Sequence, residues 1–406
     1  LLILINIGIF KFLLNLNSNY IKKNILILFL LAIVTFTGCG KKNKVSLSVP
    51  YETYKLSNGL TVVLNQDKSD PITSFVILYH VGSNREVPGK TGFAHLFEHM
   101  MFQRSENVGE DQFFKIIDGA GGDFNGGTSS DMTMYYEVVP KNALETCMWL
   151  ESDRLGYLLN TITPVSFANQ QNVVQNEKRQ GVDNMPYGYT SYVIAKNLYP
   201  AGHPYSWQVI GDMQDLKNAT IQDVKDFHNK FYVPNNATIV VSGDFVSDSV
   251  KKMIEKYFGE IPSGNKVTDL KPSPVTLKET KKIYHEDIFA KAPQFTMVFP
   301  TPQQYTKDAH ALDVLAQLLG TGKKSPMYKV LVKDKKLTSN VSVYNMTREL
   351  AGEFRINVTA NPSTSLKDVE KAIFEAFNKF ETEGFTEKDL ERTKAKLETQ
   401  FYQMMS

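Results

Sequence analysis

Cysteine is scarce in this sequence and neither sign of charge dominates it. Only Cys39 and Cys147 occur in 406 residues, so disulfide bonds cannot form the framework of the fold. Lys and Arg number 45 against 43 Asp and Glu, and no basic block is interleaved with aromatic residues, so we expect no nucleic-acid partner. The hydrophobic content of 42% is that of a globular protein, and the length suits two domains.

The apolar run near the N-terminus, residues 25–36, is too short to span a bilayer comfortably and has the length of a signal-peptide core. A lysine pair precedes it, and a Thr-Gly-Cys triplet ending at Cys39 follows it. Residues 1–40 therefore resemble a bacterial lipoprotein signal, which would make Cys39 the lipidated first residue of an exported protein in the periplasm or at the outer membrane. The alternative is an uncleaved membrane anchor that also uses the apolar residues 1–15.

Runs rich in β-branched and aromatic residues alternate with runs of helical periodicity along the chain. They predict strands at 60–65, 74–81, 133–139 and 237–244, helices at 141–158 and from Thr163-Pro164 onward, a glycine-rich turn at 116–131 and a loop at about 181–215. Residues 263–280 collect Pro, Gly and Ser and predict a linker between a first domain, 41–262, and a second, 281–406.

The second domain repeats the order strand, helix, strand of the first, which indicates a degenerate copy. Its last helix is predicted to start near Thr386, and no Gly, Pro or basic last turn ends that helix before Ser406. We therefore expect the second domain to be incomplete in this sequence.

One short apolar stretch, F-A-H-L-F-E-H-M-M-F at 93–102, contains His95, Glu98 and His99. On a helix, residues three and four apart project from one face, so the three side chains can meet one small object. Two neutral imidazoles at this spacing can bind zinc, and the carboxylate beside them can take a proton from a water molecule. The alternative is three satisfied polar residues on an amphipathic helix.

Zinc needs a third protein ligand, and Glu177 is the candidate. On the predicted helix Val173 and Val174 lie four and three residues before it, which places Glu177 on an apolar, inward face where a cation would offset its burial. The alternative is a surface carboxylate that pairs with Lys178 or Arg179, and the residues alone leave both possibilities open.

The motif and its surroundings are similar to the inverted zinc motif of the pitrilysin-type (M16) metallopeptidases. The stretches G-A-G-G-D-F-N-G-G-T, V-V-Q-N-E, H-P-Y and Y-V-P-N-N-A-T-I-V-V-S-G-D also resemble segments of that family, over about residues 51–406. The resemblance implies that His95, His99 and Glu177 bind one zinc ion per chain and that Glu98 is the general base.

The resemblance also implies an α+β fold of two related domains, each with a mixed or antiparallel sheet covered by helices, that face each other like a clamshell. In the family a peptide substrate adds to a sheet edge near the metal, where Phe124, Asn125 and Gly126 would lie. Gly126 stands where Ala is common, and a glycine there could be only a turn residue. Gln170 replaces a second carboxylate found in many members, which would alter the surroundings of the zinc.

From these observations we expect a zinc-dependent endopeptidase that hydrolyses peptides or unfolded protein segments. The alternative is a non-catalytic or partner-dependent peptide-binding subunit, because family members can work as pairs in which one chain has lost its motif. A homodimer or a heterodimer with another chain of the family is compatible with either function.

Overall fold

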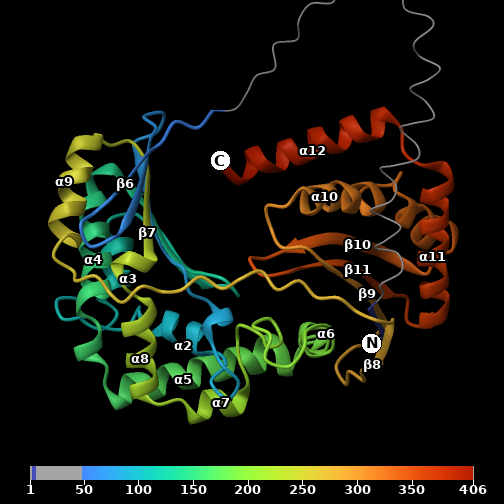
Figure 1. Cartoon of the computed structure of the whole chain (residues 1–406), viewed down its shortest axis with the longest axis horizontal. Coiled ribbons are helices and arrows are strands. Elements are labelled where there is room, and N and C mark those ends of the chain that lie inside the picture. The colour runs from blue at the N-terminus through green and yellow to red at the C-terminus, as the bar shows by residue number, and fades with distance from the viewer. Residues whose placement is uncertain (1, 6–47, 406) are drawn as a thin grey trace, which may run out of the picture. The chain divides into compact units, whose positions relative to one another are not determined.

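The computed structural model describes residues 2–5 and 48–405, which belong to two units (Figure 1). The first unit is Ser48–Leu270, and the second runs from Lys271 onward and includes the short strand β1, Leu2–Ile5. Each unit has one mixed β-sheet with helices packed on it, so the predicted α+β class is confirmed. Cys39 lies outside the described residues. None of the helices within the described ranges is both long and apolar enough to cross a membrane.

The first unit has a six-stranded sheet in the order β2-β3-β7-β4-β6-β5, in which only β3 and β7 are parallel neighbours. Its strands are β2 (Glu52–Lys55), β3 (Thr61–Gln66), β4 (Ile72–Tyr79), β5 (Asp123–Thr128), β6 (Thr133–Pro140) and β7 (Ala237–Gly243). Its helices are α2 (Phe93–Met100), α3 (Gln112–Gly119), α4 (Leu144–Tyr157), α5 (Pro164–Lys178), α6 (Thr190–Leu198), α7 (Met213–Asn218), α8 (Ile221–Phe231) and α9 (Ser247–Phe258).

Alternation of side chains builds the core of the first unit. Along β4, Phe75, Ile77 and Tyr79 are fully buried and the residues between them are partly exposed, as expected for a strand with one face on the core. Helix α4 packs on β4 and β6, and α2 lies against β5, α5 and α8. This packing places the helix with the two histidines beside the edge strand of the sheet.

A buried charged cluster joins α4 to the sheet, and nothing in the sequence pattern predicts it. Arg154 is 1% exposed, and its Nε donates to Glu151 at 2.8 Å while its guanidinium lies 3.7 Å from Glu137 on β6. Burial raises the pKa of Glu137, and the neighbouring Glu151 carboxylate raises it further. The guanidinium also lies over the ring of Tyr135, 4.1 Å from its centroid, so the cluster fixes α4 on β6.

The second unit has a five-stranded sheet in the order β10-β11-β9-β1-β8. Its other strands are β8 (Lys281–Tyr284), β9 (Gln294–Thr301), β10 (Thr338–Thr347) and β11 (Gly352–Ala360), and its α-helices are α10 (Lys307–Gly320), α11 (Leu366–Glu383) and α12 (Glu387–Met405). Thr386 and Asp389 exchange hydrogen bonds at the start of α12, as the sequence predicts.

The two sheets have the same order when β5-β6-β4-β7-β3 is set beside β10-β11-β9-β1-β8. This shared strand order is consistent with the predicted repeat. One strand differs in direction: β7 is antiparallel to β4, whereas β1 is parallel to β9. The second unit thus fills the corresponding position with a strand of opposite polarity, drawn from a different part of the chain.

Two predictions of irregular structure are wrong. The predicted loop at 181–215 contains helix α6, whose Ile194, Ala195 and Leu198 are buried at helical spacing. The Tyr, Pro and Gly residues around this helix are typical of loops, and they hid the helical spacing of its three buried residues. The predicted glycine-rich turn contains the second half of α3 and the strand β5, because the partly buried face of β5 packs on aromatic rings despite its two glycines.

Candidate metal centre

Helix α2 begins at a residue that has no side chain to cap it. The N-cap residue is Gly92, at φ 86°, and the carboxylate of Glu86 takes the capping role by accepting from the backbone N–H of Gly92 at 3.0 Å and of Ala94 at 2.8 Å. Burial raises the pKa of Glu86 to about 8, although the hydrogen bonds from these backbone N–H groups lower it. Glu86 is missed by the sequence pattern, because it lies six residues before the N-cap rather than at it.

Three donor atoms converge between α2 and α5. His95 Nε2 and His99 Nε2 are 3.3 Å apart, and Glu177 Oε2 lies 3.6 Å from the first and 3.4 Å from the second. Ligand atoms at zinc distances of about 2.0–2.1 Å and tetrahedral angles lie about 3.3 Å from one another. The three separations therefore suit a single zinc ion without rearrangement. Among the described residues, no other three metal-ligating side chains bring their donor atoms this close together.

His95 is in the protonation state that binds metals. His95 and His99 are 17% and 19% exposed, and burial together with the neighbouring His99 lowers the pKa of His95 from 6.5 to about 4. His95 is therefore neutral at neutral pH and offers a lone pair. Its Nδ1 atom is buried and has no hydrogen-bond partner within the described ranges, so packing rather than a hydrogen bond orients this ring.

Glu177 reaches this position in a different way from the one predicted. Its side chain is 43% exposed, and Val173 on the same predicted face is 38% exposed, so the face is not inward. Of the two valines on α5, only Val174 is buried, so the helix is only weakly amphipathic. Glu177 meets the histidines because α5 packs on α2, and its alternative partners are engaged elsewhere: Lys178 with Asp183, and Arg179 with Asn176.

Glu98 lies on α2 beside these three residues and is 8% exposed. The hydroxyl of Thr128, at the end of β5, donates to its Oε2 at 2.6 Å. Burial raises the pKa of Glu98, while the Thr128 hydrogen bond and the His99 side chain lower it. The net effect raises the pKa of Glu98 above its usual value, and Thr128 is a contact that sequence reasoning did not identify.

The three predicted substrate-binding residues lie on β5, which pairs only with β6 and is therefore a sheet edge. Phe124 stacks with Phe114 at 5.1 Å, and Asn125 is exposed. Gly126 is not a turn residue but a strand residue: a Cβ atom there would lie 2.9 Å from the ring of Phe102. The space that a side chain needs is occupied.

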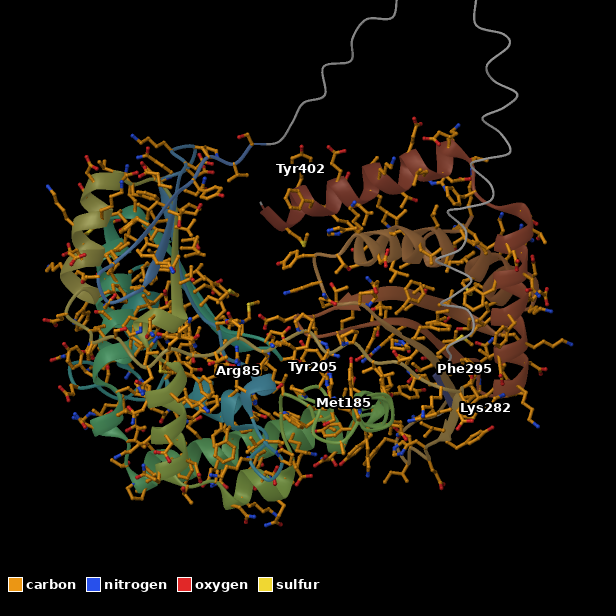
Figure 2. The ribbon with its side chains drawn as sticks, viewed as in Figure 1. Arg85, Met185, Tyr205, Lys282, Phe295 and Tyr402 are labelled. Carbon is orange, nitrogen blue, oxygen red and sulfur yellow. The ribbon has the colours of Figure 1, made fainter. Side chains whose placement is uncertain are left out.

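The turn that follows this edge strand is held by the segment around the predicted H-P-Y landmark. Tyr205, labelled in Figure 2, is buried, and its hydroxyl donates to Asp131 at 2.6 Å. The Asn84 amide donates to the same carboxylate oxygen at 3.1 Å. Two distant segments therefore fix the β5–β6 turn, next to Thr128 and the Glu98 carboxylate.

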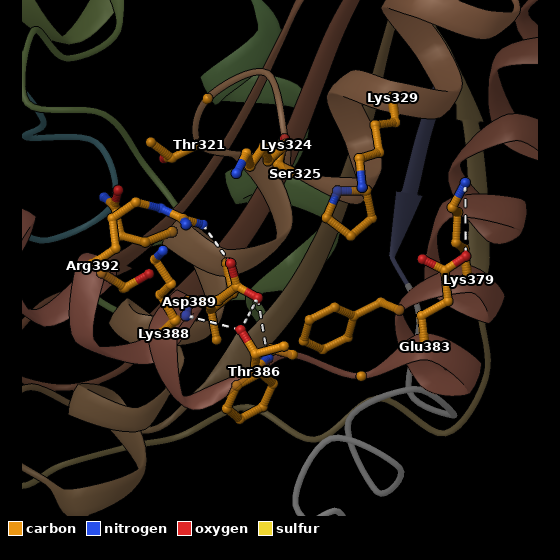
Figure 3. Close-up of a pocket in the computed structure, with 18 of the residues that line it drawn as sticks. Thr321, Lys324, Ser325, Lys329, Lys379, Glu383, Thr386, Lys388, Asp389 and Arg392 are labelled. Carbon is orange, nitrogen blue, oxygen red and sulfur yellow. Dashed lines mark hydrogen bonds and ion pairs between the residues drawn. The ribbon is translucent and has the colours of Figure 1, made fainter.

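A cavity of about 820 Å³ lies in the second unit, and its lining differs in chemistry from the candidate metal centre (Figure 3). It is lined by six cations, Lys324, Lys329, Lys379, Lys388, Arg392 and Lys396, and by two carboxylates. Asp389 bonds Thr386 and Arg392, and Glu383 lies 3.8 Å from Lys379. Both carboxylates are paired with neighbouring side chains, so the excess of positive charge disfavours a metal ion in this cavity. Cavity volume therefore does not identify the metal centre.

Two family models match the chain on either side of residue 200. The model of "Insulinase (Peptidase family M16)" matches residues 61–195, and that of the "Peptidase M16 inactive domain" matches residues 218–397. A protein of Helicobacter pylori, "Zinc protease PqqE", is 31% identical over 359 residues, which cover 86% of this chain and 79% of that protein. The chain belongs to the M16 family of peptidases. All four residues of the candidate centre lie within the first match and none within the second.

Other M16 proteins show the same extent of similarity. "Uncharacterized zinc protease YmxG" of Bacillus subtilis is 24% identical over 85% of this chain and 82% of its own. A crystal structure described as "a protease from Helicobacter pylori" has a TM-score of 0.78 and 29% identity, and covers 87% of this chain and 85% of that one. The similarity extends over both units.

Proposed function

We propose that this M16 chain is a zinc-dependent endopeptidase that cleaves peptides or unfolded protein segments. The observation that carries the proposal is the convergence of His95, His99 and Glu177 at separations of 3.3–3.6 Å, with the Glu98 carboxylate beside them. The relatives named zinc proteases support the same chemistry. One zinc ion would occupy the centre, held by the two imidazoles and the Glu177 carboxylate.

When bound, zinc would act as a Lewis acid that polarises the scissile carbonyl and makes a water molecule easier to deprotonate. Glu98 would take the proton from this water as it attacks, and then deliver a proton to the leaving amine. Thr128 would hold the Glu98 carboxylate in place through its 2.6 Å hydrogen bond. No side chain of this centre needs to form a covalent bond to the substrate.

We propose that the substrate adds to β5 as a further strand. The outer edge of β5 is unpaired among the described residues, and its last residue, Thr128, bonds the proposed base. A peptide paired along Phe124, Asn125 and Gly126 would bring its backbone to the metal centre. Recognition through backbone hydrogen bonds suits unfolded segments of varied sequence.

The test compares the unmodified chain with its Glu98→Gln variant in zinc content and in cleavage of an unstructured peptide. We expect both to bind about one zinc per chain and only the unmodified protein to cleave. Glu391→Gln, an exposed carboxylate on α12, is the matched control and should cleave normally. Absence of zinc from the unmodified protein would refute the metal centre, and equal cleavage by Glu98→Gln would refute the role of the base.

The alternative function is a subunit that binds peptide and requires a partner. The relatives include proteins named mitochondrial-processing peptidase subunit beta, of Schizosaccharomyces pombe and Saccharomyces cerevisiae, at 25% and 24% identity. Binding of zinc without cleavage by the isolated chain would favour this alternative. Recovery of cleavage on adding a second M16 chain would then establish it.

We propose further that the protein is exported and held at a bacterial membrane through a lipid on Cys39. The basis is the lipoprotein-like segment at residues 1–40, and an M16 protein of similar fold is described as the periplasmic protease PqqL from Escherichia coli. Mass spectrometry of the mature N-terminus tests this proposal. A lipidated Cys39 is expected, and an intact residue 1–40 segment would favour the uncleaved anchor.

A further inference from the structure

The helix that carries Glu177 changes its winding directly after the proposed ligand. Helix α5 ends at Lys178, and residues Arg179–Asp183 form a π-helix, in which the N–H of Asn184 donates to the carbonyl of Arg179 at 2.8 Å. Short π-helical turns inside helices are uncommon and are frequent at functional sites. The side chain next to Glu177 explains why the turn forms here.

Lys178 is a buried cation with a specific set of partners. Its side chain is 5% exposed, and its Nζ donates to Asp183 at 2.7 Å. The same Nζ lies 5.4 Å from the ring centroid of Tyr189 and 5.2 Å from that of Tyr192. The hydroxyl of Tyr189 donates to Asp183 at 2.7 Å, so the carboxylate is held from two sides. A buried lysine is costly unless paired in this way.

The ion pair and the π-helix depend on each other. In an α-helix, residues five apart point about 140° away from one another, because each residue advances by about 100°. The wider π-turn, with its hydrogen bonds from residue i+5 to residue i, brings Lys178 and Asp183 onto one side. The pair therefore stabilises the π-turn and fixes the rotation of the last α-turn, on which Glu177 lies.

The same residues connect α5 to the start of the histidine helix. The hydroxyl of Tyr192 donates to the carbonyl of Gly211 at 2.9 Å. Gly211 and Gly92 approach so closely that a Cβ on Gly211 would lie 2.5 Å from the backbone of Gly92, the N-cap of α2. The N–H of Asp212 donates to Thr91 at 2.9 Å. A continuous set of contacts thus runs from Lys178 to the helix of His95 and His99.

We propose that Lys178 is a positioning residue of the metal centre, which holds Glu177 at the distance from the two histidines that zinc requires. This inference rests on the function proposed above. Glu177 is the most exposed of the three proposed ligands, at 43%, and within the described ranges its side chain forms no ion pair or hydrogen bond except with the two histidines. The fixed neighbour, rather than the ligand itself, provides the rigidity.

The test measures the zinc dissociation constant of the full chain by competition with a chelator, together with the thermal unfolding of the zinc-free protein. Lys178→Met keeps the length of the side chain and removes its charge, and Asp183→Asn, at a quarter-exposed position, removes the partner. Lys196→Met, on the exposed face of α6, is the control. Loss of a residue that supports a metal ligand costs about ten- to a hundred-fold in metal affinity.

We expect Lys178→Met and Asp183→Asn each to weaken zinc binding at least about ten-fold. The double variant should bind zinc no more weakly than the single variant with the lower zinc affinity, because both substitutions break the same ion pair. The kcat/KM at saturating zinc should recover toward that of the unmodified chain. A purely structural role would lower the unfolding temperature of the zinc-free protein without moving the dissociation constant beyond that of Lys196→Met, and would overturn the inference. If the unmodified chain binds no zinc, both this inference and the proposed function are overturned.

Discussion

Two adjacent glycines on β5 are in opposite environments, and single substitutions can distinguish them. A Cβ on Gly126 would lie 2.9 Å from Phe102 and 3.0 Å from the buried Tyr135, whereas a Cβ on Gly127 would meet nothing within 4 Å. We expect Gly126→Ala to lower the free energy of unfolding by about 1–3 kcal/mol through overpacking. Gly127→Ala should leave it unchanged or raise it by about 0.5–1 kcal/mol. Urea unfolding of both variants checks this, and equal effects would contradict it.

His228 on α8 is a buried histidine that does not belong to the metal centre. It is 8% exposed and contacts the ring of Phe97 on α2, with centroids 5.5 Å apart. Burial lowers its pKa from 6.5 to about 4, so between these values the unfolded chain binds a proton that the folded protein does not. Stability contributed by neutral His228 is therefore complete above pH 6.5 and falls as the pH is lowered toward 4.

We expect this loss to be on the order of 3 kcal/mol, since each pKa unit corresponds to about 1.4 kcal/mol. His228→Phe should flatten the dependence of unfolding free energy on pH over this window. Urea unfolding at intervals from pH 4 to pH 7, in the absence of zinc, measures both curves. Parallel curves for the two proteins would show that His228 does not titrate as described.

The candidate centre shows which residues a sequence can identify. His95, Glu98 and His99 follow from spacing within one helical turn, and the structure places all three on α2. Glu86 and Lys178 do not, because each acts across a turn or loop with no periodic signal. Glu177 was proposed both from the residue pattern and from the resemblance, but the inward apolar face predicted for it was wrong, because the packing of α5 on α2 rather than amphipathicity directs its side chain.

At the scale of elements, α5 has its stabilising cap at the opposite end from its proposed ligand. Thr163 accepts from the N–H of Ser166 at 3.1 Å, and Ser166 accepts from the N–H of Thr163 at 3.1 Å. Thr163→Ala should lower the free energy of unfolding by about 1 kcal/mol. Zinc affinity should stay within about two-fold of the unmodified chain, because the cap lies four turns from Glu177.

Chelator competition and thermal unfolding of Thr163→Ala test this separation. Ser166→Ala, which removes the other half of the capping box, should behave in the same way and serves as its match. A ten-fold loss of zinc affinity in either variant would show that α5 transmits disorder along its whole length. A loss of zinc affinity in the Lys178 variants would then reflect helix stability rather than the ion pair with Asp183.

Elements with a strong period were predictable, and those defined by long-range packing were not. Strands such as β4 alternate apolar and polar residues, so their burial follows from sequence. The strand β5 has no such signal, since its two glycines resemble a turn, and it forms because β6 pairs with it and Phe124 packs on Phe114. Helix α6 was hidden by Tyr and Gly residues that make contacts to α5 and to the loop before α7.

At the scale of the whole molecule, the two units share one strand order, but among the described residues only the first has a group of side chains that could bind a metal ion. Helix α10 follows β9 as α2 follows β4, and is therefore its counterpart. It has one histidine, His310, which is exposed and lies 4.0 Å from Asp313. Zinc should therefore bind to the folded first unit and stabilise it.

Hydrogen exchange with and without zinc tests this division. A ligand at a thousand times its dissociation constant stabilises the state that binds it by about 4 kcal/mol. We expect slower exchange in α2 and α5, where the three proposed ligands lie, and no direct protection in α10, α11 or α12. Removal of zinc with a chelator should reverse the effect. Equal protection of the helices of both units would mean that the two unfold as one cooperative body, so that stabilisation at the metal centre is felt throughout the chain.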